Sequence, residues 1–324
     1  MAGPILNWET RLGRRLKLRD LHILLTVVQS GSMAKGAANL GISQPAISEA
    51  IAGLENTLGV RLLDRNPRGV EPTIYGRALL KRSSVVFDEL KQGIGDIEFL
   101  ADPGRGEIRI GCPESLCAGF VPAIIDRLTQ RYPRVSVQVA IAQPGEQELR
   151  ELRDRSVDLL LGRIFKPVSA DDVATEILCD DAFFVVAGAD SRWPRRRRIA
   201  LADLTGEPWV MFPANSLSGS YIAEAFRARG IDLPRQRIES FSIQVRLHLL
   251  ATGGFLTALH GSVLRFNAKT WALKTLPLDL STRPMPIAIF TLKNRTVSPV
   301  VQLFIEYARQ VAASAGSFAA RHSY

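Results

Sequence analysis

The stretch from residue 32 to residue 62, SMAKGAANLGISQPAISEAIAGLENTLGVRL, specifies the structure of the N-terminal part of the chain. It contains two helical patterns separated by Gly41, and a serine precedes each of them, Ser32 and Ser43. Serine is a preferred N-cap, and glycine adopts the positive φ that a tight turn between helices needs. Because the small Ala37 allows a second helix to pack closely, the stretch predicts a helix-turn-helix.

The flanking sequence predicts a third helix and a wing. Apolar residues at spacings of three and four predict a preceding helix from about residue 17, which Gly31 ends. The turn sequence Asn66-Pro67-Arg68-Gly69 predicts a β-hairpin over 60–72. Thr73 is then expected to cap a long helix that reaches to about Ala101.

The long helix carries a row of residues in alternating steps of four and three, which is the spacing of a coiled-coil seam. The row consists of Leu79, Ser83, Val86, Leu90, Gly93, Ile97 and Leu100. Ser83 and Gly93 interrupt its apolar character, so the pattern predicts a short, imperfect dimer seam. Thirty helical residues would extend about 45 Å, which is enough to separate two domains.

The net charge of +9 is concentrated in the N-terminal quarter of the chain. Residues 1–82 hold 12 Lys and Arg against 6 Asp and Glu, whereas the other 242 residues hold 29 against 26. A concentrated positive field favours binding to a polyanion such as nucleic acid.

Other bulk features exclude several classes of protein. No run of 18 apolar residues is present, so we expect no membrane span and no membrane partner. The first 15 residues lack the apolar segment of a secretory signal. The three cysteines show no metal-ligand spacing and are too few for a disulfide framework. We therefore expect a cytoplasmic protein without a metal or other cofactor.

The start of the helix after Gly41 has the character of a DNA-reading surface. Gln44 can bridge the N6 and N7 atoms of adenine, and serine hydroxyls can bond bases or phosphates. In the hairpin, Arg65 and Arg68 are placed to contact phosphates as a wing. The predicted DNA-binding residues are Ser32, Met33, Lys35, Ser43, Gln44, Pro45, Ser48, Glu49, Arg65, Arg68 and Thr73.

From Glu107 onward, strands alternate with helices, which predicts parallel sheets. Two such runs, with crossings near 165–185 and 275–290, predict two lobes with a cleft between them. The fold class is therefore α+β with several domains. Its predicted parts are a winged helix-turn-helix over 1–72, a linker helix over 73–104 and a two-lobed α/β domain over 105–324, with lobe I at about 105–168 and 285–324 and lobe II at about 169–284.

The N-terminal stretch closely resembles the DNA-binding domain of LysR-type transcriptional regulators. The matching residues are Ser32, Ala37, Ala38, Leu40, Ser43, Gln44, Pro45, Ala46, Ser48, Ile51, Leu54, Glu55, Leu58, Gly59 and Leu62, followed by Arg65, Thr73 and Gly76. The resemblance is specific over 18–80 and is one of architecture beyond 106. Glu49 departs from it, because a basic or amide residue is common there; a carboxylate could accept from cytosine N4. Leu63 stands where phenylalanine is usual.

The resemblance implies a mechanism and a set of partners. The recognition helix would begin at Ser43, the linker helix would form a dimer and pairs of dimers would form tetramers. The C-terminal part would be an effector domain like a periplasmic solute-binding protein. The implied partners are duplex DNA at a promoter or operator, a small-molecule effector, a second copy of the chain and, as a further candidate, RNA polymerase. The chain also resembles, more faintly, the sugar-responsive branch of the family.

The effector site is expected where strands end and helices begin, because ligands of α/β lobes bind there. In LysR-type regulators the corresponding turns line the effector pocket. The predicted effector-binding residues are Pro113, Glu114, Ser115, Gln143, Gly145, Arg163, Asn215, Ser216, Gly253 and Thr257. Glu114 and Glu146 would repel a simple carboxylate, so a polyhydroxylated or cationic ligand fits these residues better.

Other functions remain as alternatives. An enzyme is disfavoured because the sequence has no nucleotide-binding glycine motif, no nucleophile elbow and no HExxH, and no catalytic residue is assigned. His248 and His260 are interpreted as structural. A solute-binding protein for transport would have no use for the DNA-type N-terminal part. A nonspecific DNA-binding protein would have no use for the two C-terminal lobes. Cys112 and Cys117 lie near the first turn of the predicted cleft; packing thiols are favoured over a redox switch.

Overall fold

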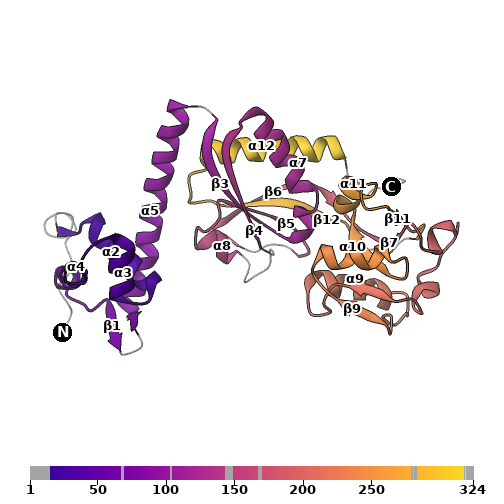
Figure 1. Ribbon diagram of the computed structural model, residues 1–324, viewed down its shortest axis with the longest axis horizontal. Helices are drawn as coiled ribbons and strands as arrows, with labels where there is room; N and C mark the ends of the chain where they lie inside the picture. The colour runs from indigo at the N-terminus through magenta and orange to yellow at the C-terminus, as the bar shows by residue number, and fades with distance from the viewer. Residues whose placement is uncertain are drawn as a thin grey trace. The chain divides into compact units, whose positions relative to one another are not determined.

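The computed structural model describes residues 15–66, 69–102, 104–142, 149–166, 170–278, 280, 283–316 and 318. The chain divides into two compact units, Met1–Gly93 and Ile94–Tyr324. Figure 1 shows the helices and strands of both units, with labels on many of them.

The N-terminal unit contains the three predicted short helices, α2 (Leu18–Ser30), α3 (Met33–Leu40) and α4 (Gln44–Leu58). Each ends at a glycine in the left-handed conformation: φ is 71° at Gly31, 64° at Gly41 and 70° at Gly59. Most side chains are disfavoured in this conformation, so the glycines fix the places where the helices stop. The predicted positions of all three glycine stops are confirmed.

The three helices enclose an apolar core. Leu24 and Val27 of α2 and Ile47 and Ile51 of α4 are fully buried in it. Helix α3 approaches α2 closely at Gly36, where an added Cβ would lie 2.9 Å from a methyl group of Val27. The missing side chain at Gly36 therefore contributes to the packing of the helix-turn-helix.

The wing is the antiparallel hairpin of β1 (Leu63–Asn66) and β2 (Gly69–Pro72). The amide of Val70 donates to the carbonyl oxygen of Gly31 at 3.0 Å, which holds the hairpin against the end of α2. A carboxylate oxygen of Glu55 accepts from the amides of Leu62 at 2.7 Å and Leu63 at 3.2 Å. Leu63 is buried in the core, so leucine fills this position without exposing apolar surface.

Helix α5 (Ile74–Ala101) follows the hairpin and extends to the predicted end. The Thr73 hydroxyl caps it by accepting from the amide of Gly76 at 3.1 Å. Within the predicted seam Ser83 is buried, whereas four apolar side chains are exposed over 42–79% of their surface. These four are Val86, Leu90, Ile97 and Leu100.

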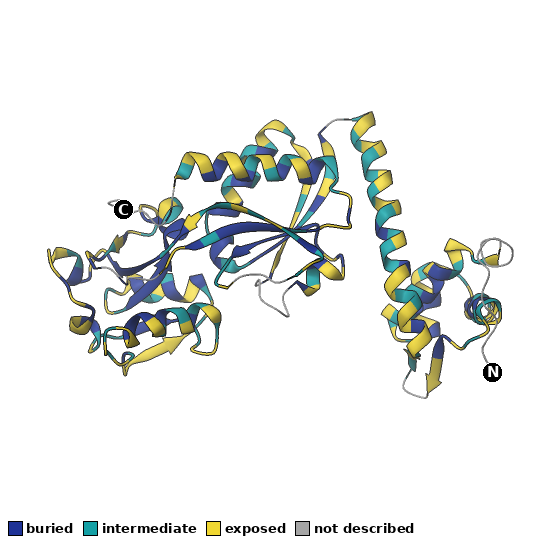
Figure 2. Cartoon of the chain, turned by 180° about the vertical axis from the view of Figure 1, so that it is seen from behind, coloured by how far each residue is buried: buried dark blue, intermediate teal, exposed yellow. Residues whose placement is uncertain are grey.

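The C-terminal unit begins with a five-stranded sheet in the order β4-β3-β5-β12-β6. The strands are β3 (Arg105–Cys112), β4 (Arg134–Ile141), β5 (Leu159–Arg163), β6 (Val173–Asp181) and β12 (Met285–Leu292). The helices that accompany them are α6 (Glu114–Cys117), α7 (Phe120–Arg131), α8 (Arg150–Arg153) and α12 (Pro299–Ala315). Helices α7 and α12 bury one face of this sheet, and α8 covers part of the other. Figure 2 shows the buried strands between helices whose outer faces are exposed.

A second five-stranded sheet has the order β11-β7-β10-β8-β9. Its strands are β7 (Phe183–Gly188), β8 (Trp209–Met211), β9 (Arg237–Glu239), β10 (Leu256–His260) and β11 (Leu273–Thr275). Helix α9 (Leu217–Arg227) packs on one face, and α10 (Ile243–Ala251) and α11 (Gly261–Asn267) pack on the other. Short 3₁₀ helices, Trp193–Arg195 and Leu201–Leu204, lie between β7 and β8.

Two sequence predictions for this unit are wrong. The sheets are mixed rather than parallel, because β12 runs antiparallel to β5 and β6, and β7 runs antiparallel to β10 and β11. The first lobe does not end at about 168, because β6 pairs with β12 and belongs to the first sheet. Two pairs of polar residues interrupt this edge strand, VATEILCDD, so it lacks the continuous apolar run of the buried strands.

Candidate functional site

The start of α4 is positioned by two serine caps and a glycine turn. Ser32 Oγ accepts from the amide of Lys35 at 3.1 Å, and Ser43 Oγ accepts from the amide of Ala46 at 3.3 Å. Pro45 occupies the first turn of α4, where a helix has no partner for an amide hydrogen. The buried Ile47 fixes the opposite face of the helix. The first turn of α4 is therefore held by local contacts and directed away from the core.

Most of the predicted DNA-binding residues are accessible on this surface. The exposed ones are Lys35, Ser43, Gln44, Pro45, Glu49 and Arg65, while Ser32 and Ser48 are half-buried. Within the described part of the chain, no hydrogen bond engages the side chain of Gln44, so its amide is available to a partner.

Two of the predicted residues also have structural roles. Met33 is only 7% exposed and its side chain belongs to the apolar core, which leaves its contact with DNA a prediction. The hydroxyl of Thr73 donates to the carbonyl oxygen of Arg61 at 2.7 Å and caps α5, which leaves little of it for a phosphate. Arg68 lies outside the described residues.

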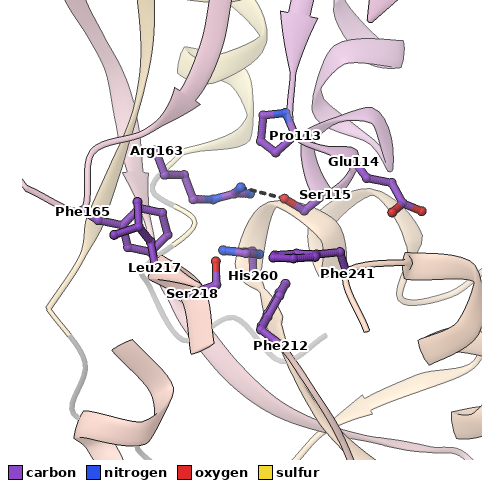
Figure 3. Close-up of a pocket in the computed structure, with 10 residues that line it drawn as sticks. All are labelled: Pro113, Glu114, Ser115, Arg163, Phe165, Phe212, Leu217, Ser218, Phe241 and His260. Carbon is purple, nitrogen blue, oxygen red and sulfur yellow. Dashed lines mark hydrogen bonds between the residues drawn. The ribbon is translucent and has the colours of Figure 1, made fainter. Parts of the chain in front are cut away.

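A pocket lies between the two sheets of the C-terminal unit, where several strands end (Figure 3). Arg163 ends β5, Phe212 follows β8 and His260 ends β10. The lining consists of Pro113, Glu114, Ser115, Arg163, Phe165, Phe212, Leu217, Ser218, Phe241 and His260. Its walls combine aromatic rings with a few polar groups, the composition expected of a site for a small molecule.

Arg163 is the centre of a buried polar network. Its guanidinium donates to Asp181 at 2.9 Å, to Ser115 at 2.8 Å and to Ser262 at 2.8 Å. The side chains of Arg163 and Asp181 are 2% and 0% exposed. Burial lowers the pKa of Arg163, and the neighbouring carboxylate of Asp181 opposes that shift. Because the arginine is paired inside the protein, it offers no uncompensated positive charge to a ligand.

Glu114 connects the two lobes directly. Its carboxylate accepts from the amide of Ile243 at 3.0 Å and from the hydroxyl of Ser242 at 3.4 Å. Both partners lie at the start of α10, where free amides and the helix dipole favour a negative charge. Part of the bonding capacity of Glu114 is thus taken up by the second lobe.

His260 is a buried polar side chain that lines the pocket. It is 2% exposed, and neither ring nitrogen has a hydrogen-bond partner among the described residues. The ring lies 4.2 Å from that of Phe183 and 5.8 Å from that of Phe212, measured between centroids. Burial lowers the pKa of His260 well below its usual range, and the charges of Arg163 and Arg246 lower it further. The imidazole is therefore neutral near pH 7 and presents one donor and one acceptor.

Arg246 of α10 supports the aromatic wall from behind. Its guanidinium carbon lies 3.6 Å from the centroid of the Phe212 ring. The guanidinium also donates to the hydroxyl of Thr257 at 3.1 Å and to the carbonyl oxygen of Ser240 at 2.6 Å. These contacts hold Phe212 in the pocket and tie α10 to the second sheet.

The structure brings together four of the predicted effector-binding residues, Pro113, Glu114, Ser115 and Arg163. It separates four others from the described pocket. Ser216 caps α9, Thr257 is buried within the second sheet, and Asn215 and Gly253 are not among the lining residues. Gln143 and Gly145 lie outside the described residues.

Sequence reasoning missed six lining residues, namely Phe165, Phe212, Leu217, Ser218, Phe241 and His260. The interpretation of His260 as structural is incomplete, because its ring packs against Phe183 and also lines the pocket. The strand-end rule could have found Phe212 and His260, since both stand at the carboxyl ends of strands. The residues predicted at the strand ends include none of the aromatic ones.

The described residues lack both a metal-ligating cluster and a helix that could cross a membrane. No group of three or more His, Cys, Asp or Glu side chains is arranged to hold a metal ion there. Among the described helices, none is both long enough and apolar enough to cross a membrane.

Two family models match the chain, one for each unit. Residues 18–77 match the family described as bacterial regulatory helix-turn-helix protein, lysR family. Residues 101–313 match the family described as LysR substrate binding domain.

Known proteins similar to the chain match it along most of its length. The HTH-type transcriptional regulator GbpR of Azospirillum brasilense is 29% identical over 298 residues, which cover 90% of this chain and 85% of GbpR. A full-length OxyR variant from Pseudomonas aeruginosa is 21% identical with a TM-score of 0.65, covering 91% of this chain and 98% of that one. Full-length CbnR in complex with its target DNA is 20% identical with a TM-score of 0.63, covering 91% and 100%. The two structures support the fold.

Proposed function

Because the chain belongs to the LysR family of bacterial transcription regulators, we propose that it reads duplex DNA through the first turn of α4. It is a DNA-binding regulator with a substrate-binding domain. In the proposed complex, Gln44 contacts base edges in the major groove, and Ser43, Ser48 and Glu49 lie beside it. Ser32, Lys35 and Arg65 contact the flanking phosphates.

The exposed, unpartnered amide of Gln44 at the start of a well-capped helix is the observation that supports this proposal most strongly. The opposite face of α4 is buried in the core, so the helix cannot rotate the Gln44 amide away from a DNA groove. The concentration of positive charge in residues 1–82 supplies the nonspecific part of the attraction.

The test is the affinity of the full chain for duplexes that carry its own promoter region, compared with scrambled duplexes. Gln44→Ala should weaken specific binding by about 1–3 kcal/mol and blur the base preference. The matched control is Asn56→Ala, an exposed amide near the other end of α4. An unchanged base preference in Gln44→Ala would disprove the groove assignment, and equal affinity of the wild type for both duplexes would support a nonspecific DNA-binding protein.

Arg65 provides a second, electrostatic test. Arg65→Ala should weaken binding to all sequences. It should also reduce the slope of log affinity against log salt concentration by about one, the value for one lost phosphate contact. An Arg65→Ala variant whose salt dependence equals that of the wild type would exclude the wing from the phosphate contacts.

We propose that the pocket of Arg163 and His260 binds the effector, and that the effector is uncharged and hydroxylated. The pairing of Arg163 with Asp181 and of Glu114 with α10 leaves little charge for an ionic ligand. The neutral His260 can exchange two hydrogen bonds with hydroxyl groups, while Phe212 and Phe241 offer apolar surface to the face of a ring. The cationic ligand suggested by the sequence is less suitable, because Glu114 is already bonded.

Calorimetry with neutral sugars, sugar acids, amines and aromatic acids tests this ligand class. A neutral sugar should bind the wild type, and His260→Phe should remove that binding while keeping a ring against Phe183. Tight binding of a benzoate-type acid or of an amine, with no binding of neutral sugars, would overturn the proposed class but leave the pocket as the site.

The exposed apolar row of α5 supports the proposal of a homodimer. A second copy that covers Leu90, Ile97 and Leu100 would bury surface that the single chain leaves in water. Leu90→Glu should shift the sedimentation coefficient toward that of a monomer, and Lys91→Glu is the control on an exposed neighbouring position. An unshifted Leu90→Glu variant would exclude this row from the interface.

A two-fold dimer should bind an imperfect palindrome, because the symmetry of the protein is mirrored in the site. Pairs of dimers would give the tetramer suggested by the resemblance. Because its partner is the promoter, we also propose that the regulator acts in the cytoplasm and meets RNA polymerase there.

A further inference from the structure

The C-terminal unit contains two thiols in contact beside the pocket. Cys112 ends β3 and Cys117 ends α6, and both are free. Their sulfur atoms lie 3.2 Å apart. A disulfide bond is about 2.05 Å long, so the two sulfurs need to approach by roughly 1 Å to bond.

The environments of the two thiols differ, and they favour Cys117 as the nucleophilic thiol and Cys112 as the resolving thiol. Cys112 is fully buried, whereas Cys117 is partly accessible. A hydrogen bond from the Cys112 thiol lowers the pKa of Cys117, and the same contact together with burial raises that of Cys112. The thiolate is the reactive form of cysteine, so the more accessible sulfur is also the more reactive one.

The segment between the two cysteines carries contacts of both lobes. Glu114 binds the start of α10 in the second lobe, and Ser115 accepts from Arg163. Helix α6 has only four residues, so a displacement of Cys117 is transmitted to both of these side chains. The thiol pair is therefore linked to the pocket through the backbone of α6.

We propose that Cys112 and Cys117 are a modification site at which a peroxide forms a reversible intramolecular disulfide, and that this bond alters the attachment of Glu114 to α10. The formation of the bond depends on the two thiols alone. Its regulatory consequence rests on the proposed function of the pocket. The packing role that the sequence favoured for these cysteines would then describe only the reduced state.

The reaction balances with hydrogen peroxide as the two-electron oxidant. The Cys117 thiolate attacks one peroxide oxygen, the O–O bond breaks, and the departing hydroxide takes up a proton to leave as water. The sulfur of Cys112 then attacks the resulting sulfenic acid, and the second hydroxide leaves with the thiol proton as water. Two thiols and one peroxide thus give one disulfide and two waters, and an external dithiol reverses the reaction by exchange.

Cys179 on β6 is the internal control. Burial and the charges of Asp181 and Asp180 raise the pKa of its thiol to about 12. Its thiolate is therefore scarce at neutral pH, and we expect it to react slowly.

The experiment treats the reduced full-length protein with hydrogen peroxide, alkylates the remaining thiols under denaturing conditions and maps the peptides by mass. The tryptic peptide 110–127 contains both cysteines of the pair. We expect it to lose the mass of two hydrogens and both alkylation sites, while Cys179 stays alkylated and a dithiol restores the original mass. The variant Cys179→Ser should behave like the wild type. Cys112→Ser should leave a sulfenic acid on Cys117 that a sulfenic-acid probe captures.

Three results would overturn the disulfide: both thiols of 110–127 remaining alkylatable, Cys179 reacting first, or Cys117 advancing to a sulfinic acid without a bond to Cys112. The coupling to α10 has its own readout, which needs neither DNA nor an effector. The amide of Ile243, which donates to Glu114, should lose protection against hydrogen exchange on oxidation and regain it on reduction. Unchanged protection in the disulfide form would overturn the coupling alone, and a failure to bind DNA would bear on the proposed function alone.

Discussion

Polar side chains at the start of α4 and polar side chains in the cleft are held in different ways. At the starts of α3 and α4 the serine hydroxyls bond amides three residues away, and Gln44 and Glu49 on α4 stay exposed. In the cleft Arg163 bonds groups 18, 48 and 99 residues away, and all of them are buried. The first arrangement is local and open to water, whereas the second depends on the whole unit being folded.

This difference decides how a substitution in each site is to be interpreted. A change at an exposed residue of α4 removes a contact with the partner and leaves the stability of the unit nearly intact. A change in the cleft leaves a buried group without its partner and lowers stability first. A loss of effector response in a cleft variant therefore needs a measured free energy of unfolding beside it.

The largest effect is expected from Asp181→Asn. This substitution leaves the buried guanidinium of Arg163 without a counter-charge, so the free energy of unfolding of the C-terminal unit should fall by about 3–5 kcal/mol. Denaturant titration of the full chain measures it through tryptophan fluorescence, because Trp193, Trp209 and Trp271 lie in this unit.

The matched control is Asp172→Asn, which breaks the exposed pair between Arg153 and Asp172. Its cost should be about 0–1 kcal/mol, because water and salt screen that pair. Equal losses in the two variants would break the comparison, since burial would then not be what makes the Arg163 network expensive to disturb.

Glu55 is expected to be an exception within the N-terminal unit. Its carboxylate bonds the amides of two buried residues, Leu62 and Leu63, so it resembles the cleft more than the DNA-facing surface. Glu55→Ala should lower the free energy of unfolding by about 1.5–3 kcal/mol, the range for hydrogen bonds to a charged group. Hydrogen exchange should show lost protection at both amides. Glu55→Gln, which keeps one acceptor oxygen, should lose less, and an equal loss would mean that the negative charge is the whole effect.

The same contrast explains what could be predicted from the sequence. The helix ends at Gly31, Gly41 and Gly59 follow from rules that need only a few neighbouring residues, and so do the caps at Ser32 and Ser43. The burial of the Met33 side chain could not be predicted, because a single residue in the first turn of a helix does not reveal which way it faces. Its burial depends on how α3 packs in the core of the unit.

In the cleft the sequence located the strand ends but not the side chains that converge there. Ser115 and Arg163 belong to the first lobe and Ser262 to the second, so their meeting depends on the crossing after Asp181. The predicted lobe boundary at about 168 excludes β6, because this edge strand has no continuous apolar run. The strand end at His260 can be read from the sequence, but the lack of a partner for its ring is a property of the folded cleft.

The pH dependence of stability provides the next test of the cleft. The unfolded His260 takes up a proton near pH 6.5, whereas burial keeps the folded imidazole neutral there. Below about pH 6.5 the unfolded state binds one proton more, so the free energy of unfolding falls by about 1.4 kcal/mol per pH unit until the folded pKa is reached. Above pH 6.5 both states are neutral and the contribution is constant.

The variant His260→Gln isolates this contribution. It removes the titrating group, so its free energy of unfolding should decline less steeply than that of the wild type between pH 6.5 and lower pH. The comparison concerns slopes, which a general destabilisation by the substitution does not alter. Parallel declines in the two proteins would show that His260 titrates normally and is not enclosed as described.

The smallest effect on stability is expected at Ser43. Substitutions there also distinguish an effect on DNA binding from an effect on folding most clearly. Ser43→Ala removes the acceptor for the amide of Ala46 and should cost about 1 kcal/mol, measured by denaturant titration with circular dichroism. Ser43→Asp keeps a capping oxygen and a favourable charge at the start of α4, so its stability should stay close to that of the wild type. Its carboxylate would nevertheless face phosphate, and its affinity for duplex DNA should fall below that of Ser43→Ala. The contrary outcome is an affinity for DNA that falls in the same order as stability, from serine through aspartate to alanine. Position 43 would then affect DNA binding only through the stability of α4. Folding would govern the exposed surface of α4 as it governs the cleft.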